Sequence, residues 1–201
     1  ARVGWLPQQA VAGSSDTVLS VASSQMAWID GLRQELEAAE ARVTAGDVSA
    51  VPRYERATEA FRLAGGFAIE ETIGEVLHGL GFGADTWQRS CDTFSGGWQM
   101  RIALARTLLS RPDIALLDEP TNHLDLAARH WLAGFLSKAP FTTVIVSHDR
   151  YLLDRTVDRI AEIRHKQLHT YTGRFGDFLR ERELRESQHQ AAYDKQQAER
   201  A

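Results

Sequence analysis

Two acidic residues, Asp118 and Glu119, directly follow a predicted strand at 113–117. Its apolar run is typical of a strand that is buried on both faces of a parallel sheet. Proteins with such sheets place their ligands at the carboxyl ends of the strands. A carboxylate there can hold Mg²⁺, directly or through water, and a second carboxylate can polarise an attacking water. We therefore predict Asp118 as a metal ligand and Glu119 as a catalytic residue, with an ordinary solvated strand end as the alternative.

A glycine-rich turn, Ser95-Gly96-Gly97, opens a predicted helix at 97–110. A serine at this position can cap the free N–H groups of the helix, and glycines let the backbone approach a bulky anion closely. The positive end of the helix adds to the attraction for phosphate. The turn thus predicts a phosphate site, and an ordinary capped helix start is the alternative.

Two other polar residues end predicted strands. His148 follows a strand at 141–146, where a neutral imidazole could contact a terminal phosphate and sense its loss. Gln8 ends a strand at 1–8, where its amide could bind a metal-bound water. Each residue alone is a weak signal, because polar residues at strand ends are commonly just solvated.

Composition places these residues in a globular chain with a real core. The 201 residues are 43% hydrophobic and 25% charged, with a net charge of -4. That charge argues against a chain that is basic throughout, although a local basic face remains possible. The single cysteine, Cys91, excludes an internal disulfide and is predicted to be a small semi-buried side chain rather than a nucleophile. No apolar run approaches the length of about 18 residues that a membrane span needs.

Strands and helices alternate along the chain, which predicts an α/β fold with a parallel sheet. Helices at 18–45 and 52–64 should form a hairpin that interrupts this alternation. Further predicted helices cover 69–80, 126–138, 150–156 and 175–201, and two short strands around a turn cover 159–164 and 167–171.

Taken together, the motifs resemble those of ATP-binding cassette (ABC) ATPases. The segment 95–99 is similar to the signature motif, 114–118 to the Walker B strand, and Glu119 to the catalytic glutamate. Leu124-Asp125 resembles the D-loop, His148 the switch histidine and Gln8 the Q-loop. The runs 122–125 and 147–151 resemble one branch closely, the ABC-F proteins, which are cytoplasmic tandem-cassette ATPases that act on ribosomes.

The resemblance implies a partial P-loop NTPase fold with assigned residue roles. Residues 1–16 and 65–174 would be part of a nucleotide-binding domain, 17–64 a helical arm insertion, and 175–201 the start of an interdomain linker helix. Glu119 and His148 would be catalytic, and Asp118 and Gln8 would bind Mg²⁺. The expected contacts to ATP are Gln8, Ser95, Gly96, Gly97, Gln99 and Asp125. The expected partners are a second cassette of the same parent chain and the ribosome, through its rRNA and tRNA, without membrane insertion.

The resemblance lacks one part, the P-loop. None of the lysines, at 138, 166 and 195, follows a glycine, so these residues hold no Gly-Lys-Ser/Thr. We expect the P-loop to lie before Ala1 and the second cassette after Ala201, and the chain alone to be inactive. Since the P-loop strand is central in the cassette sheet, we also expect the strands at 113–117 and 142–146 to lack a neighbour.

Two other functions remain open. The ATPase subunit of a membrane transporter would share every ATP motif, but the hairpin at 17–64 and the charged final helix argue against it. A non-catalytic interaction module would keep the fold without turnover, but intact Asp118, Glu119 and His148 argue against that. Arg180, Arg182 and Arg185 on the final helix are predicted to pair with RNA phosphates, with a merely solvated helix as the alternative.

Overall fold

The computed structural model describes residues 1–6, 15–164 and 166–198. It divides into two compact units. One comprises Ala1–Trp131 and Pro140–Val146, and the other comprises Leu132–Ala139 and Ser147–Ala201. Each unit is described by itself.

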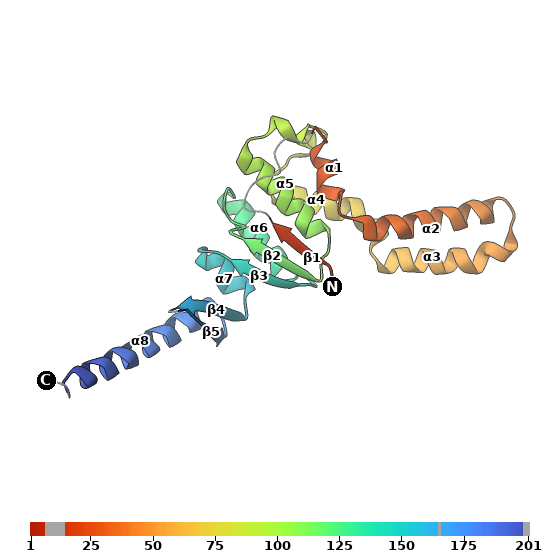
Figure 1. The fold of residues 1–201 in the computed structure, drawn as a ribbon. Coiled ribbons are helices and arrows are strands. Elements are labelled where there is room, and N and C mark those ends of the chain that lie inside the picture. Colours follow the sequence, from red (N-terminus) through yellow and green to blue (C-terminus); the bar gives the residue numbers. More distant parts are fainter. Residues whose placement is uncertain (7–14, 165, 199–201) are drawn as a thin grey trace. The chain divides into compact units, whose positions relative to one another are not determined.

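A parallel sheet of three strands lies at the centre of the first unit (Figure 1). The strands are β1 (Val3–Leu6), β2 (Ile114–Asp118) and β3 (Thr142–Val146), in the order β1-β2-β3. Leu6, Leu117 and Ile145 lie side by side in register. This arrangement confirms the predicted α/β fold with a parallel sheet.

One face of the sheet is covered by helix α5 (Gly96–Leu109). Gly4, Ala115 and Leu117 on this face are buried. A Cβ atom at Gly4 would come within 3.1 Å of Pro112 and 3.3 Å of Thr107, closer than ordinary contact. Glycine is therefore what lets β1 lie this close to α5 and the loop that follows it.

The opposite face of the sheet carries an exposed apolar row. Trp5, Leu116 and Val144 lie side by side in register, and they are 64%, 37% and 52% exposed. Because successive strand residues point to opposite faces, only every second residue of each apolar run is covered. The prediction that these strands are fully buried was therefore wrong for this face.

Strands β2 and β3 are direct neighbours, with Leu116 opposite Val144 and Asp118 opposite Val146. The expectation that both strands would lack a neighbour was wrong for β2, which is hydrogen-bonded on both sides. It holds for β3 on one side, because β3 is an edge strand of the described sheet and pairs with β2. Strand order depends on tertiary packing, and the sequence of apolar residues within one strand does not determine which strands lie next to it.

The insertion between β1 and α4 is a helical hairpin, as predicted, but its first helix is broken. Helix α1 spans Val18–Ser23 and α2 spans Ala27–Thr44. Between them, Ser23 Oγ donates to the Leu19 carbonyl at 2.8 Å and Ser24 Oγ donates to the Val21 carbonyl at 2.8 Å. Serine hydroxyls that bond to the backbone in this way weaken a helix, which explains the interruption of the predicted helix 18–45.

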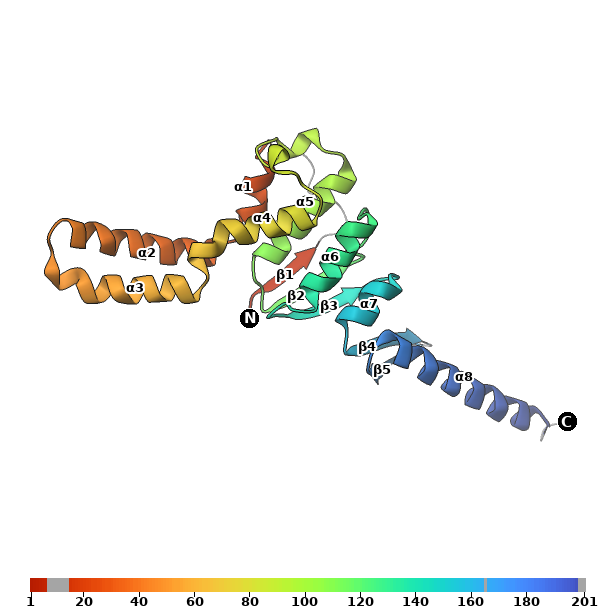
Figure 2. The same cartoon turned by 180° about the vertical axis from the view of Figure 1, so that it is seen from behind.

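Helices α2 and α3 (Val51–Leu63) lie side by side in both views (Figures 1 and 2). Arg111, in the loop before β2, contacts this hairpin both where it begins and where it ends. Its guanidinium lies 4.7 Å from the ring centroid of Trp28, at the start of α2. Its Nη1 donates to the carbonyl of Ala64, directly after α3, at 2.9 Å.

The remaining helices of the chain agree closely with the predicted ranges. They are α4 (Ile69–Gly79), α6 (Leu126–Leu136), α7 (Arg150–Thr156) and α8 (Phe175–Ala198). Short 3-10 turns lie at Val48–Ala50, Gly66–Ala68, Ala84–Thr86 and Cys91–Thr93. Gly46, Gly65 and Gly81 follow α2, α3 and α4 with positive φ angles of 89°, 77° and 94°, a conformation that glycine adopts at little cost.

In the second unit, β4 (Arg159–Arg164) and β5 (Gln167–Thr172) form the predicted antiparallel pair. Aromatic and arginine side chains join this pair to the start of α8. The ring centroids of Tyr171 and Phe178 are 4.9 Å apart, and the guanidinium of Arg185 lies 4.8 Å from the Tyr171 ring. Among the described residues, no helix is both long and apolar enough to cross a membrane.

Candidate active site

The two acidic residues lie at the carboxyl end of β2, as the sequence pattern predicts. Asp118 is the last residue of the strand, opposite Val146 of β3. The next amide, that of Glu119, donates to the Val146 carbonyl at 2.7 Å. Glu119 has a φ of 47°, which turns the chain sharply away from the sheet. This left-handed conformation is uncommon for residues other than glycine.

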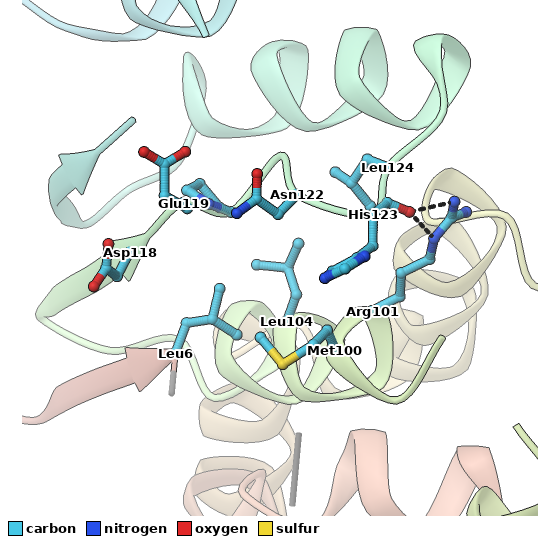
Figure 3. Close-up of a pocket in the computed structure, with 10 residues that line it drawn as sticks. Leu6, Met100, Arg101, Leu104, Asp118, Glu119, Asn122, His123 and Leu124 are labelled. Carbon is cyan, nitrogen blue, oxygen red and sulfur yellow. Dashed lines mark hydrogen bonds between the residues drawn. The ribbon is translucent and has the colours of Figure 1, made fainter. Parts of the chain in front are cut away.

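A pocket of about 300 Å³ opens beside these carboxylates (Figure 3). Its walls come from the end of β1, from α5 and from the loop after β2. The lining residues are Leu6, Met100, Arg101, Leu104, Asp118, Glu119, Pro120, Asn122, His123 and Leu124. Asp118 and Glu119 lie at one end of the view, Arg101 lies at the other, and His123 lies between them.

The loop after β2 is folded by its own backbone. The amide of Asn122 donates to the Glu119 carbonyl at 3.0 Å, and the amide of Leu124 donates to the Thr121 carbonyl at 3.1 Å. His123 has a φ of 68°, so this short loop contains a second left-handed residue. Thr121 and Leu124 are buried. The position of Glu119 is therefore tied to the conformation of the whole loop.

Arg101 of α5 is a site residue that sequence reasoning missed. It is only 8% exposed, and its Nε and Nη2 donate to the His123 carbonyl at 2.9 Å and 2.6 Å. The sequence pattern that could have revealed Arg101 is a charged residue directly before the apolar stretch 102–105 of a predicted helix. It also lies four residues after Gly97. On a helix, residues four apart lie on the same face.

Asp125 ends this loop and caps α6. Its Oδ1 accepts a hydrogen bond from the Ala128 amide at 2.9 Å, and its Oδ2 accepts one from Arg101 Nη1 at 3.3 Å. The bond from the Ala128 amide and the pairing with Arg101 lower the pKa of Asp125 below its ordinary value. The charged form of this carboxylate therefore fastens the loop to the start of α6.

The glycine-rich turn begins α5, but Ser95 does not cap the helix. Its backbone has the extended conformation of an N-cap residue, yet its side chain makes no capping hydrogen bond. The prediction of a capping serine was wrong on this point, and the hydroxyl is exposed at the helix start.

The two glycines of the turn differ in their surroundings. A Cβ atom on Gly96 would meet nothing within 4 Å, whereas one on Gly97 would lie 3.2 Å from the Cβ of His123. Packing within the described chain thus requires a small residue at Gly97. At Gly96 the space is open.

Gln99 has a structural role in the described chain. Its Nε2 donates to the carbonyls of Phe94 at 3.1 Å and Cys91 at 3.4 Å, which holds the preceding turn against α5. Cys91 is buried, and that burial raises the pKa of its thiol. A raised pKa leaves little reactive thiolate, in agreement with the predicted structural role of this cysteine.

Of the predicted site residues, Asp118 and Glu119 line this pocket, whereas Ser95, Gly96, Gly97, Gln99 and Asp125 do not. Two further predicted residues cannot be compared with it. Gln8 lies outside the described residues. His148 belongs to the second unit, so its position relative to Glu119 remains a prediction. Within that unit, Asp149 Oδ1 caps α7 by accepting a bond from the Leu152 amide at 3.1 Å, which fixes the backbone next to His148.

The donor set at the carboxyl end of β2 suits Mg²⁺. Asp118 and Glu119 offer hard oxygen atoms, and Mg²⁺ in nucleotide sites is commonly held by one or two carboxylates together with phosphate oxygens. The described residues include no group of three or more His, Cys, Asp or Glu side chains placed to hold a metal ion.

Family models support the sequence motifs. A model described as "ABC transporter" matches residues 1–122, and a second model with the same description matches residues 161–201.

Several curated proteins are similar to the chain. The probable ATP-binding protein YheS of Haemophilus influenzae is 37% identical over 196 residues, which cover 98% of this chain and 30% of that protein. The ATP-binding cassette sub-family F member 3 of Mus musculus is 38% identical over 200 residues, covering 94% and 27%. YheS of Escherichia coli K12 is 44% identical over 131 residues, covering 65% and 21%. The chain therefore spans less than a third of the length of these relatives.

Solved structures share the fold. The ATP-binding subunit of an ABC transporter has a TM-score of 0.60 at 15% identity, covering 92% of this chain and 63% of that chain. An archaeal ribosome recycling factor, solved in complex with a ribosomal stalk protein, has a TM-score of 0.57 at 25% identity, covering 89% and 29%.

Proposed function

Because the chain belongs to the ATP-binding cassette family, we propose that it forms part of an ABC-F ATPase that binds ATP with Mg²⁺ and hydrolyses it. The relatives that match nearly the whole chain, one of them named as an F member, confirm the resemblance to this branch. The observation that carries the proposal is the pocket at the carboxyl end of β2, where Asp118 and Glu119 meet the loop that Arg101 holds.

The proposed roles follow from the chemistry of each group. Asp118 holds the cation, with Gln8 as a second oxygen ligand. Bound Mg²⁺ supplies positive charge that offsets the charge of the phosphates. Glu119 accepts a proton from the attacking water, and His148 donates a hydrogen bond to the terminal phosphate.

The start of α5 is proposed as a second phosphate contact. Ser95 offers a hydroxyl that does not cap the helix, and Gly96 leaves open space for a bulky anion. The first N–H groups of a helix favour negative charge. By family resemblance, Ser95, Gly96 and Gly97, with Gln99 behind them, serve ATP that a second cassette holds, and Asp125 takes part at the same cassette interface.

The proposed setting is a cytoplasmic tandem-cassette protein that acts on ribosomes. The α2–α3 hairpin supports this setting over a transporter subunit, since it matches the arm of the ABC-F branch in place and type. The 201 residues assayed by themselves should not hydrolyse ATP, because they hold no Gly-Lys-Ser/Thr to bind the β- and γ-phosphates.

The test uses a chimera in which these residues replace the matching segment of YheS from H. influenzae, which supplies the rest of its length. Glu119→Gln should keep ATP binding but slow hydrolysis by about 10²-fold or more, because an amide cannot act as a base. Glu70→Gln, at an exposed acid on α4, is the matched control and should leave the rate unchanged.

Binding is measured with a fluorescent ATP analogue and hydrolysis by phosphate release. The Asp118→Asn, Glu119→Gln double variant gives the background from the rest of the chimera. A Glu119→Gln rate equal to that of the unsubstituted chimera would remove the role that we give to Glu119.

A further inference from the structure

Arg101 is a buried cation in the second turn of α5, 8% exposed. The residues after it, Ile102 to Ala105, are buried and apolar. A charge in such surroundings is costly unless hydrogen bonds and an opposite charge compensate for it. The positions of its partners therefore show what this side chain holds together.

The partners of Arg101 come from two segments that are distant in sequence. Nε and Nη2 both donate to the His123 carbonyl, and Nη1 donates to the Leu80 carbonyl at 3.0 Å and to Asp125 Oδ2 at 3.3 Å. The guanidinium also lies 4.4 Å from the ring centroid of Trp98. One side chain thus joins α5, the end of α4 and the loop after β2. Figure 3 shows the two bonds from Arg101 to His123.

The hydrogen bonds act on a strained part of the loop. His123 has a φ of 68°, and a non-glycine residue keeps such a conformation only where its surroundings hold it. Arg101 holds the carbonyl of that residue with two of its N–H groups. The same loop begins at Glu119, whose carbonyl accepts the Asn122 amide at 3.0 Å.

The start of α5 contacts the same residue from another side. A Cβ atom on Gly97 would lie 3.2 Å from the His123 Cβ, so the first and second turns of α5 both touch His123. A displacement of the glycine-rich turn would therefore reach the loop that carries Glu119.

We propose that Arg101 is a positioning residue that couples phosphate binding at Ser95–Gly97 to the placement of Glu119 in the pocket. This inference rests on the proposed function. By that proposal the two sites serve different ATP molecules, so Arg101 would make hydrolysis at one site respond to occupancy of the other.

Arg101→Lys in the chimera is the decisive variant. Lysine keeps the charge, but its single ammonium group cannot reproduce the planar fork that bonds to His123 and Leu80 together. We expect kcat to fall about tenfold or more, with ATP affinity changed by less than about twofold, since the interaction matters for turnover and not for binding. The Hill coefficient for ATP should fall towards 1.

Arg106→Lys is the matched control on the same helix. Its Nε has no hydrogen-bond partner within the described parts of the chain. This variant should keep kcat, ATP affinity and cooperativity.

Hydrogen exchange separates positioning from a general loss of structure. In Arg101→Lys the amides of Asn122, Leu124 and Ala128 should exchange faster, whereas those of Ala115 and Leu117 in β2 should keep their rates. Faster exchange in both sets, with a lowered melting temperature, means a merely structural role and overturns the proposal. Unchanged exchange and unchanged kcat also overturn it.

Failure of the proposed function can be distinguished from failure of the role proposed for Arg101. If the unsubstituted chimera does not hydrolyse ATP, the proposed function fails. The exchange of the loop amides with and without bound ATP analogue then still decides whether Arg101 links the two segments.

Discussion

Asp125 shows how one carboxylate can link the stability of the loop to pH. Its pKa is lowered by the bond from the Ala128 amide and by Arg101. The charged form is thus favoured in the folded chain. Its contribution to stability is present above the ordinary pKa of an aspartate and is lost as the pH falls through the lower folded value.

We expect Asp125→Asn to lower the free energy of unfolding at pH 6, and to lower it by a smaller amount at pH 3. Asparagine can still accept the Ala128 bond, but it cannot pair with the charge of Arg101. The measurement is the free energy of unfolding in urea for both chains at both pH values. A destabilisation that is equal at pH 6 and pH 3 would contradict the charged role of Asp125.

Residue types and spacing were enough to locate Asp118 and Glu119, because two acids directly after an apolar strand must lie at its carboxyl end. They were not enough to find Arg101. Its partners are a carbonyl from His123 and another from Leu80, and carbonyls leave no mark in a sequence. The sequence also could not show that the Ser95 side chain makes no capping hydrogen bond, since side-chain orientation depends on the surrounding fold.

At the scale of elements, α4 packs closely against α6. A Cβ atom on Gly79, the last residue of α4, would overlap the indole ring of Trp131. By contrast, a Cβ atom on Gly31, inside α2, would meet nothing within 4 Å. The two glycines form a natural pair for comparing a packing requirement with intrinsic helix propensity.

Gly79→Ala should destabilise the chain by about 1–3 kcal/mol, because the added methyl group forces Trp131 to move. Gly31→Ala should stabilise it by about 0.5–1 kcal/mol, since alanine favours the helix interior. Both are measured by urea unfolding, and tryptophan fluorescence should shift only in Gly79→Ala. Equal effects of the two substitutions would show that α4 does not require the glycine.

Element boundaries were predictable where local chemistry sets them. Gly46, Gly65 and Gly81 end helices in a conformation suited to glycine, and apolar periodicity located α4 and α5. The break between α1 and α2 depends on which carbonyls two serine hydroxyls contact, so it could not be read from periodicity. The direct pairing of β2 with β3 was also beyond local pattern, because it is a property of the assembled sheet.

At the scale of the whole molecule, the exposed row Trp5, Leu116 and Val144 should bind hydrophobic dyes. Adjoining apolar side chains form a larger patch than scattered single ones, and such patches commonly bind apolar molecules. Val144→Thr, which keeps the branched shape, should lower dye fluorescence. Val48→Thr, at an 80% exposed residue between α2 and α3, is the control and should not change it. Equal fluorescence of the two variants would count against a contiguous patch.

Helix α8 supplies a prediction about the proposed ribosomal partner. Arg185 stacks on Tyr171 and pairs with Glu181 at 2.6 Å, and Arg182 lies over Phe178. These two arginines have structural roles in the described chain. Arg180 is more exposed, at 78%, although it pairs with Asp177. It is therefore the best single test of phosphate contact.

Arg180→Gln in the chimera should weaken ribosome binding. It should also reduce the steepness of the slope of log K against the logarithm of the salt concentration by about 0.7–0.9, which corresponds to the loss of one phosphate contact. Arg180→Lys keeps the charge and should retain both values. Co-sedimentation with ribosomes over a range of salt concentrations provides the measurement. If Arg180→Gln binds like the unsubstituted chimera while the protein fractionates with membranes, the transporter alternative is favoured.

Arg111 contacts the hairpin both where it begins and where it ends, and this has a geometric consequence. Since Trp28 at its entry and Ala64 at its exit meet the same guanidinium, the length of the hairpin is independent of its attachment. The 18 residues of α2 span about 27 Å, and one heptad added to or removed from each helix would change the reach by about 10 Å. A change in the length of α2 and α3 should therefore move the far end of the hairpin while leaving the two contacts with Arg111 in place.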